Sequence, residues 1–163
     1  MHRRTVIAGF STVFGLGLSG CLGALSDDEE TQEVVEKYEQ AYFHNTQAVE
    51  DLEDGLENYH SSDYGAAELR FDDAEGEFRT AEEELPEIEE VAELGSEDAT
   101  DIIVEDTAVL SGAQVAAGHS ALTAQSLQGD TAPLSKPPLE NLEEDIRTGE
   151  FVIPDPETFE SAF

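Results

Sequence analysis

The sequence has few positively charged residues, a single cysteine and no tryptophan. Only 7 of its 163 residues are Lys or Arg, whereas 39 are Asp or Glu, which gives a formal charge of -32. Proteins that bind nucleic acids neutralise phosphates with Lys and Arg, so we expect no nucleic-acid partner. With Cys21 as its one cysteine, the chain cannot form an internal disulfide or a metal site built from several thiolates.

Motifs of the common catalytic sites are also missing from the sequence. It contains no Gly-rich phosphate loop, no serine-nucleophile motif and no calcium-loop spacing. Carboxylates are so abundant that pairs at general acid and base spacing are expected by chance. We therefore predict no catalytic residue, and a noncatalytic role is favoured while an enzymatic one stays open.

The acidic residues are spread along the chain. This distribution favours a role in solvation of the whole surface over a single binding site for cations or basic partners. So much like charge destabilises a compact state in dilute buffer, but at 1 M ionic strength the Debye length is about 3 Å and the repulsion is largely screened. The composition resembles that of proteins from extreme halophiles. This resemblance implies folding in concentrated salt.

The first residues have the pattern of an export signal. Arg3 and Arg4 precede an apolar stretch, 6–18, that is short and Gly-rich for a membrane-spanning helix. The stretch runs into a tetrapeptide that resembles a lipobox, the cleavage and acylation site of prokaryotic lipoproteins: Leu18, Ser19, Gly20 and Cys21. Together with the arginines it is similar to the twin-arginine signals of haloarchaeal lipoproteins, although the apolar pair and the Lys of the fuller pattern are missing.

This resemblance implies a division of the chain into three parts. Residues 1–20 form a signal peptide, 21–30 form an acidic tether that begins at a lipidated Cys21, and 31–163 form a helical domain. The protein is then expected to be exported and held by its lipid at the outer face of the cytoplasmic membrane. The alternatives are an ordinary signal peptide and a buried free thiol.

Two acidic segments have the spacing of amphipathic helices, with apolar side chains three or four residues apart. In 31–60 these positions are Val35, Tyr38, Tyr42, Asn45, Val49, Leu52, Leu56 and Tyr59. In 64–92 they are Tyr64, Ala67, Phe71, Ala74, Phe78, Ala81, Leu85, Ile88 and Ala92. We expect the polar Asn45 to set the register of the first helix, and Pro86 to kink the second or end its first part near Glu84.

Short connections are predicted at both ends of the second segment. Ser61, Ser62 and Asp63 are N-cap residues and indicate a turn between the first two helices. Gly95 followed by Ser96 combines a C-cap with an N-cap, which is typical of a tight connection between helices.

A third segment, 107–129, carries no charged residue and has two apolar lines at helical spacing. One consists of Val109, Leu110, Ala113, Ala116, Ala117, Ala121, Ala124 and Leu127. The other consists of Val104, Ala108, Val115 and Leu122. A helix that is apolar on most of its circumference is buried, and its interrupting Gln and His residues disfavour a bilayer, so we predict the central helix of a bundle. The alternative is a face reserved for a partner.

The predicted fold is all-α: an antiparallel up-down-up bundle of three long helices with a short C-terminal helix and a tail. The apolar residues of this last part are Leu139, Leu142, Ile146, Phe151, Val152, Ile153, Phe159 and Phe163. We expect the tail to close the groove of the bundle, with Asp155 and Pro156 starting a final helical turn. A partner-binding motif is the alternative.

The histidines outside the signal are the candidates for metal chemistry. Glu57 and His60 form one Glu-x-x-His pair of the kind that di-iron bundles use twice, and His44 and His119 lie on neighbouring predicted helices. One pair does not make such a site, so we predict no metal and no cofactor beyond the lipid on Cys21. A metal-binding or metal-redox bundle using His44, Glu57, His60 and His119 is the alternative.

These observations favour a noncatalytic interaction or accessory module at the cell surface. Its partners would be the membrane, through the lipid, and a protein at the cell surface. A ligand-binding or sensor bundle is a further alternative, which an apolar pocket between helices would favour.

The charge predicts that folding depends on salt. Circular dichroism should show a helical spectrum in molar KCl and a substantial loss of helix on dilution, because repulsion among carboxylates is then no longer screened. Helicity that is unchanged in dilute buffer would contradict this expectation.

Overall fold

The computed structural model describes residues 27–128 and 139–163, and these residues contain helices and no strand. The helices are α1 (Asp27–His60), α2 (Tyr64–Glu84), α3 (Ile88–Glu93), α4 (Glu97–Gln128), α5 (Leu139–Thr148) and α6 (Pro156–Glu160). The all-α prediction is confirmed. No helix in the described ranges is long and apolar enough to cross a membrane.

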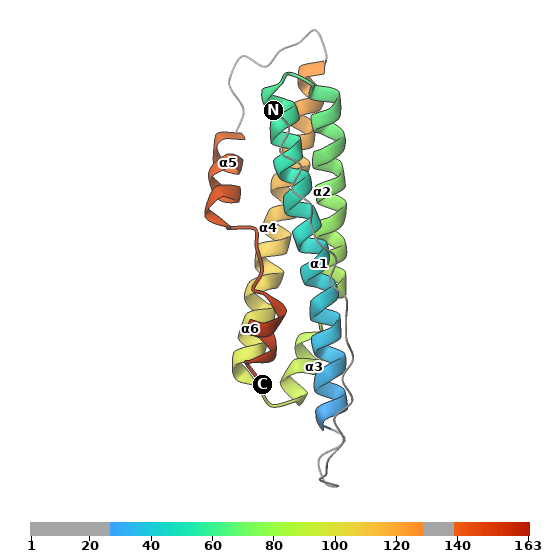
Figure 1. Cartoon of the computed structure of the whole chain (residues 1–163), viewed down its shortest axis with the longest axis vertical. Coiled ribbons are helices and arrows are strands. Elements are labelled where there is room, and N and C mark those ends of the chain that lie inside the picture. The colour runs from blue at the N-terminus through green and yellow to red at the C-terminus, as the bar shows by residue number, and fades with distance from the viewer. Residues whose placement is uncertain (1–26, 129–138) are drawn as a thin grey trace, which may run out of the picture.

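Three helices lie side by side along the long axis of the molecule: α1, α2 and α4 (Figure 1). α2 packs along both α1 and α4, whereas α1 and α4 have little direct contact. The helix between the other two is therefore α2, and the prediction that the uncharged α4 is central is wrong. Among the described helices, the one long helix that packs against α4 is α2, so part of the circumference of α4 has no described helix beside it.

The line of α1 that faces the core is displaced from the predicted one. Its buried positions are Val34, Tyr38, Ala41, Asn45, Ala48, Leu52, Gly55 and Leu56. Tyr38, Asn45, Leu52 and Leu56 were expected, but Val35, Tyr42, Val49 and Tyr59 are only partly buried. The sequence pattern overlooked Ala41, Ala48 and Gly55, because small residues do not stand out in an apolar count.

Large and small residues alternate along the facing helices, and this allows them to approach closely. On α2 the buried residues are Ala67, Phe71, Ala74, Phe78 and Ala81, as predicted. On α1, Gly55 gives room to the ring of Phe71, since a Cβ atom there would lie 2.6 Å from Phe71 Cε1. Close helix packing needs such small residues opposite large ones.

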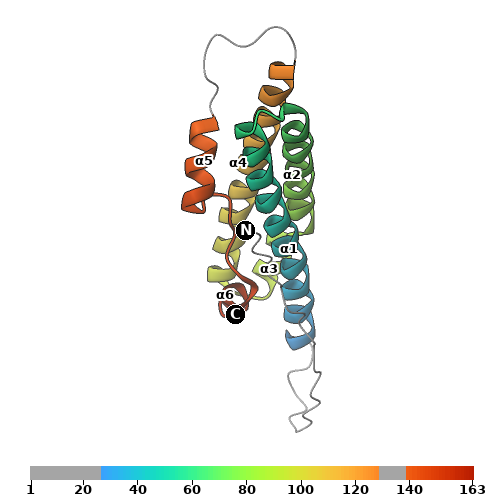
Figure 2. The same cartoon turned by 45° about the horizontal axis from the view of Figure 1, so that its top comes forward.

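The connections follow the predicted capping signals. Asp63 caps α2 by accepting a hydrogen bond from the amide of Ala66 at 3.2 Å. α2 ends at Glu84, before Pro86, so the second predicted helix is divided into α2 and the short α3. α3 lies near one end of the molecule (Figure 2) and is tied to α1 by an ion pair between Lys37 and Glu90 at 2.8 Å.

The other helix boundaries agree with the sequence signals, with one exception. Gly95 has a positive φ of 80°, and Ser96 Oγ accepts a hydrogen bond from the amide of Ala99, so the Gly-Ser connection is confirmed. α1 begins at Asp27 and not near Thr31, so the acidic residues expected at the end of the tether belong to its first turns. Carboxylates at a helix N-terminus interact favourably with the helix dipole. Gly129, expected to end α4, lies outside the described residues.

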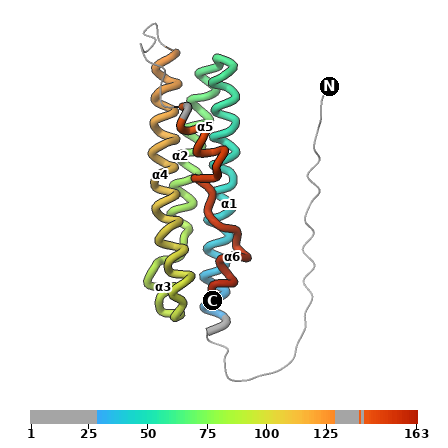
Figure 3. Tube along the Cα trace, turned by 90° about the vertical axis from the view of Figure 1, so that its left-hand side faces the viewer, coloured from blue at the N-terminus to red at the C-terminus, as the bar shows by residue number. Residues whose placement is uncertain are grey.

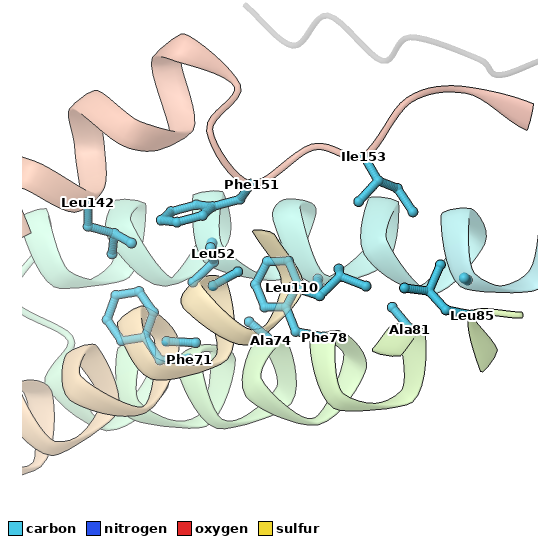
Figure 4. Close-up of a cluster of buried hydrophobic side chains, with 14 of the residues drawn as sticks. Leu52, Phe71, Ala74, Phe78, Ala81, Leu85, Leu110, Leu142, Phe151 and Ile153 are labelled. Carbon is cyan, nitrogen blue, oxygen red and sulfur yellow. The ribbon is translucent and has the colours of Figure 1, made fainter. Parts of the chain in front are cut away.

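The C-terminal part covers the side on which α1 and α4 leave a gap (Figure 3). Leu142, Phe151 and Ile153 point from this segment into the core, beside Leu52 of α1 and Leu110 of α4 (Figure 4). Phe159 of α6 is completely buried and stacks on Tyr38 with a centroid distance of 4.0 Å. The expectation that the tail closes the groove is confirmed, as is the N-cap at Asp155, which accepts a hydrogen bond from the amide of Thr158.

Asn45 contacts the tail and holds it in place. A register-setting Asn would instead contact a polar residue in the seam of a facing helix. The Nδ2 atom of Asn45 donates to the carbonyl of Phe151 at 2.7 Å, and its Oδ1 atom accepts from the amide of Ile153 at 3.2 Å. The buried amide group is therefore satisfied by the main chain of an extended segment. Satisfying buried backbone groups in this way fixes the position of the tail along α1.

The contact between Gly55 and Phe71 predicts opposite effects for two glycine substitutions. Gly55→Ala should destabilise the protein by about 1–3 kcal/mol, because the ring of Phe71 has to move. Gly76→Ala, in the interior of α2, adds a methyl group where no atom lies within 4 Å, and should stabilise by about 0.5–1 kcal/mol. Thermal unfolding in molar salt measures both, and a Gly55→Ala variant as stable as Gly76→Ala would contradict the packing described here.

Candidate functional site

The outer face of α4 is uncharged and open. Between residues 107 and 128 the helix has no Asp, Glu, Lys or Arg. The first predicted apolar line faces the core, with Leu110, Ala113, Ala117, Ala121 and Ala124 buried. The second line was also expected to be buried, and that prediction is wrong: Val104, Val115 and Leu122 are 50%, 58% and 63% exposed. This side of α4 is apolar and exposed, as the alternative prediction of a face reserved for a partner requires.

This exposed face follows the spacing that helices use to pack against one another. Successive positions are three or four residues apart, and we name them the open seam: Val104, Ala108, Ser111, Val115, Gly118, Leu122 and Gln125. The same spacing describes the buried lines of α1 and α2. The open seam is therefore a packing face on which the described part of the chain lays no helix: α2 reaches it only along one edge, through Glu68 and Glu75.

A groove lies along the open seam where α4 meets α2. Its volume is about 480 Å³, and Val115, Gly118 and Leu122 are among its lining residues from α4. α2 contributes three carboxylates at positions i, i+4 and i+7, which we name the acidic wall: Glu68, Asp72 and Glu75. Apolar side chains and carboxylates thus line one groove.

Local contacts position the acidic wall. A Cβ atom at Gly118 would lie 2.8 Å from Glu75 Oε2, so the absence of a side chain at Gly118 is what allows Glu75 to approach α4. Glu68 accepts hydrogen bonds from the side-chain amides of Gln125, at 2.7 Å, and Gln128. These amides hold the carboxylate without neutralising it.

No Lys or Arg of the described part of the chain forms an ion pair with the acidic wall, although Arg79 lies one helical turn beyond Glu75 on α2. The residues that line the groove include no Lys or Arg. Burial raises the pKa of Asp72 above its usual value, and the neighbouring charges of Glu68 and Glu75 raise it further. Three carboxylates side by side favour a cation from outside the chain.

The described basic residues are engaged elsewhere or lie away from the groove. Lys37 pairs with Glu90, Arg70 with Asp51 and Asp54, and Arg147 with Glu144. Arg79 lies on α2 outside the groove lining.

The candidate metal ligands do not come together. His44 Nδ1 lies 2.6 Å from Glu77 Oε2 of α2, whereas His60 Nε2 lies 3.8 Å from Glu143 Oε2 of α5. His119 is exposed and lines the groove, and Glu57 is exposed on α1. Within residues 27–128 and 139–163, no group of three His, Cys, Asp or Glu side chains is arranged to hold a metal ion. Cys21 and the export-signal residues Arg3, Arg4, Leu18, Ser19 and Gly20 lie outside these ranges.

A second polar feature, missed in the sequence, is a buried carboxyl group beneath the tail. Asp106 of α4 is only 2% exposed, and its Oδ2 atom lies 2.7 Å from the hydroxyl of Tyr38. The same hydroxyl lies 3.1 Å from the carbonyl of Pro154. The sequence contained a signal for the burial of Asp106, because this residue is three positions after Ile103 and four before Leu110, on the buried line of α4.

The protonation state of Asp106 decides how these three groups bond. A phenol has one hydrogen, so Tyr38 cannot donate to two acceptors at once. When Asp106 carries a proton, it donates to Tyr38 and Tyr38 donates to Pro154, so all three groups are satisfied. Burial raises the pKa of Asp106 to about 6, and the charge of Glu105 contributes, against the lowering effect of the Tyr38 hydrogen bond.

Comparison of the chain with protein-family models, with curated proteins and with solved structures finds no match. The description of the two sites therefore depends on their own geometry.

The raised pKa of Asp106 predicts that part of the free energy of unfolding is lost as the pH rises. Its pKa is about 6 in the folded protein against a usual 3.8, so the folded state binds the proton more tightly. The contribution is fully present below about pH 4 and is lost as the pH rises through 6, amounting to about 3 kcal/mol.

The variant Asp106→Asn tests this, because it keeps the shape and the hydrogen bond to Tyr38 but cannot ionise. Its stability relative to the unchanged protein should increase by about 3 kcal/mol between pH 4 and pH 7, measured by chemical unfolding in molar KCl. Comparing the two proteins removes the effect of the other carboxylates. A stability difference that does not change with pH would refute the assignment.

Proposed function

We propose that the protein is a lipid-anchored, extracytoplasmic helical bundle that acts as a noncatalytic interaction or accessory module at the cell surface. The observation that carries this proposal is the open seam of α4, an uncharged face on a chain whose formal charge is -32. Large exposed apolar residues in a row are typical of protein-binding surfaces. Val115 and Leu122 have no reactive group, so their exposure serves contact and not catalysis.

The proposed architecture is an antiparallel up-down-up bundle of α1, α2 and α4, with α5, α6 and the tail along its side. The three-residue turn at 61–63 and the Gly-Ser connection after α3 support it, because short loops join antiparallel neighbours. The course of the chain in Figure 1 is consistent with this topology. The bundle is a rigid scaffold on which α4 presents a straight face.

The proposed attachment is a lipid on Cys21 after removal of residues 1–20 by way of the twin-arginine route. The lipobox-like residues Leu18, Ser19 and Gly20 support it. With α1 beginning at Asp27, few residues separate the lipid from the bundle. The interaction surface would thus work close to the outer face of the cytoplasmic membrane.

Cys21→Ser tests the attachment. The variant should move from the membrane fraction to the soluble extracellular fraction, because no thiol remains to carry the lipid. Ser19→Ala keeps both Cys21 and a small residue at the cleavage site, and should stay with the membranes as a matched control. Membrane retention of Cys21→Ser would contradict the anchor.

Site-specific crosslinking tests the role as an interaction module. A photoreactive residue at position 122 should crosslink to one defined protein in native membranes, and the same residue at position 69 should not. Leu122 and Leu69 are matched in exposure, at 63% and 65%. Equal crosslinking at both positions, or stoichiometric iron, copper or zinc in protein purified in salt, would count against the proposal.

A further inference from the structure

The open seam has the length and the spacing of a site for one helix. From Val104 to Gln125 it extends about 32 Å at a rise of 1.5 Å per residue, which is about six helical turns. Small residues, Ala108, Ser111 and Gly118, are interspersed among the larger Val104, Val115 and Leu122. A similar mixture of small and large residues lets α1 and α2 approach each other, so the open seam is shaped for a helix with an apolar line of its own.

The two sides of the open seam differ in charge. On the α2 side stands the acidic wall, Glu68, Asp72 and Glu75. On the other side, from residue 107 onward, α4 has only residues other than Asp, Glu, Lys and Arg, including Gly112, Ala116 and Thr123. Asp145 and Glu150 of the C-terminal segment lie near Ala108 and Gly112. From Val115 onward, however, a partner helix lying on the seam would meet carboxylates along the α2 edge only.

This asymmetry decides among the occupants. Two copies that paired through this face would bring together two chains of charge -32, and neither the groove nor the open seam supplies a Lys or Arg to the other's acidic wall. An anionic lipid surface would be repelled for the same reason. A helix with cations along one edge would bury apolar area on the seam and neutralise the wall at once.

We propose that the groove between α2 and α4 binds an amphipathic helix of a partner protein, whose apolar line packs on the open seam and whose Lys or Arg side chains, at i, i+4 and i+7, pair with Glu68, Asp72 and Glu75. This assignment rests on the proposed role as an interaction module and names the chemistry of its partner. In molar salt only charges in direct contact interact appreciably, so the cations have to reach the wall itself.

The probe for this proposal is a synthetic helical peptide of about six turns, with Leu and Ala on a three-four seam and Lys along one edge. The full chain is purified in detergent, and binding is followed by fluorescence anisotropy in molar KCl. Two peptides serve as controls, one with Gln in place of the Lys edge and one with Ser in place of the apolar seam. The Lys-edged peptide should bind more tightly than both.

Variants of the protein locate the binding site. Leu122→Glu should weaken binding of the Lys-edged peptide at least about tenfold, because it places a charge in the apolar contact, whereas Leu69→Glu should leave it unchanged. The combined variant Glu68→Gln, Asp72→Asn, Glu75→Gln should weaken the Lys-edged peptide and leave the Gln-edged peptide unaffected. All substituted side chains are exposed or lie at the groove, and circular dichroism verifies that each variant is folded.

Four results would overturn the proposal. Equal effects of Leu122→Glu and Leu69→Glu on the affinity would show that the peptide does not bind at the open seam. Equal affinity for the Lys-edged and Gln-edged peptides would remove the acidic wall from the site. A dimer of the free protein that Leu122→Glu dissociates would assign the open seam to a second copy. If crosslinking at position 122 captures a defined partner that contacts the seam through an uncharged or acidic helix, the partner chemistry is wrong while the role as an interaction module stands.

Discussion

The arrangement of the helices depends on the close approach of α1 and α2, which the alternation of large and small side chains makes possible. The ring of Phe71 lies where a Cβ atom of residue 55 would be, and Ala67, Ala74 and Ala81 separate the aromatic residues of α2. α4 packs against the remaining side of α2, so α1 and α4 hardly meet. Both the groove that the tail fills and the free face of α4 follow from α2 lying between the other two.

The tail completes the core with a combination of apolar and polar contacts. Phe151, Ile153 and Phe159 are buried, while Asn45 and Tyr38 hydrogen bond to the main chain between them. An extended segment cannot form the internal backbone hydrogen bonds of a helix, so the side chains of Asn45 and Tyr38 supply hydrogen-bond partners for its backbone groups. Asn45 and Asp106 are therefore polar residues of the core with a structural purpose, and both belong to the surface that receives the tail.

Local signals predicted local structure well in this chain. Asp63, Pro86, Gly95 and Asp155 each act within one turn, and the helices begin or end where these residues indicate. What could not be predicted was the number of neighbours that each helix has. Val104, Val115 and Leu122 have the same spacing as buried residues, and a pattern in one helix does not say whether another helix lies opposite. The acidic wall was missed for the same reason. Glu68, Asp72 and Glu75 form one wall of a groove only because α4 lies beside them, and the sequence of α2 does not show this.

The hydrogen bonds of Asn45 to Phe151 and Ile153 join residues more than a hundred positions apart. Synthesis runs from the N-terminus, so α1, α2 and α4 are made before the segment that covers them, and the core is incomplete until residues 151–159 have been added. A product of premature termination would expose Leu52, Phe78 and Leu110 along an unsealed channel. The contacts of residues 151–159 with α1 and α4 thus make the helices of the core dependent on a segment that is distant from them in sequence.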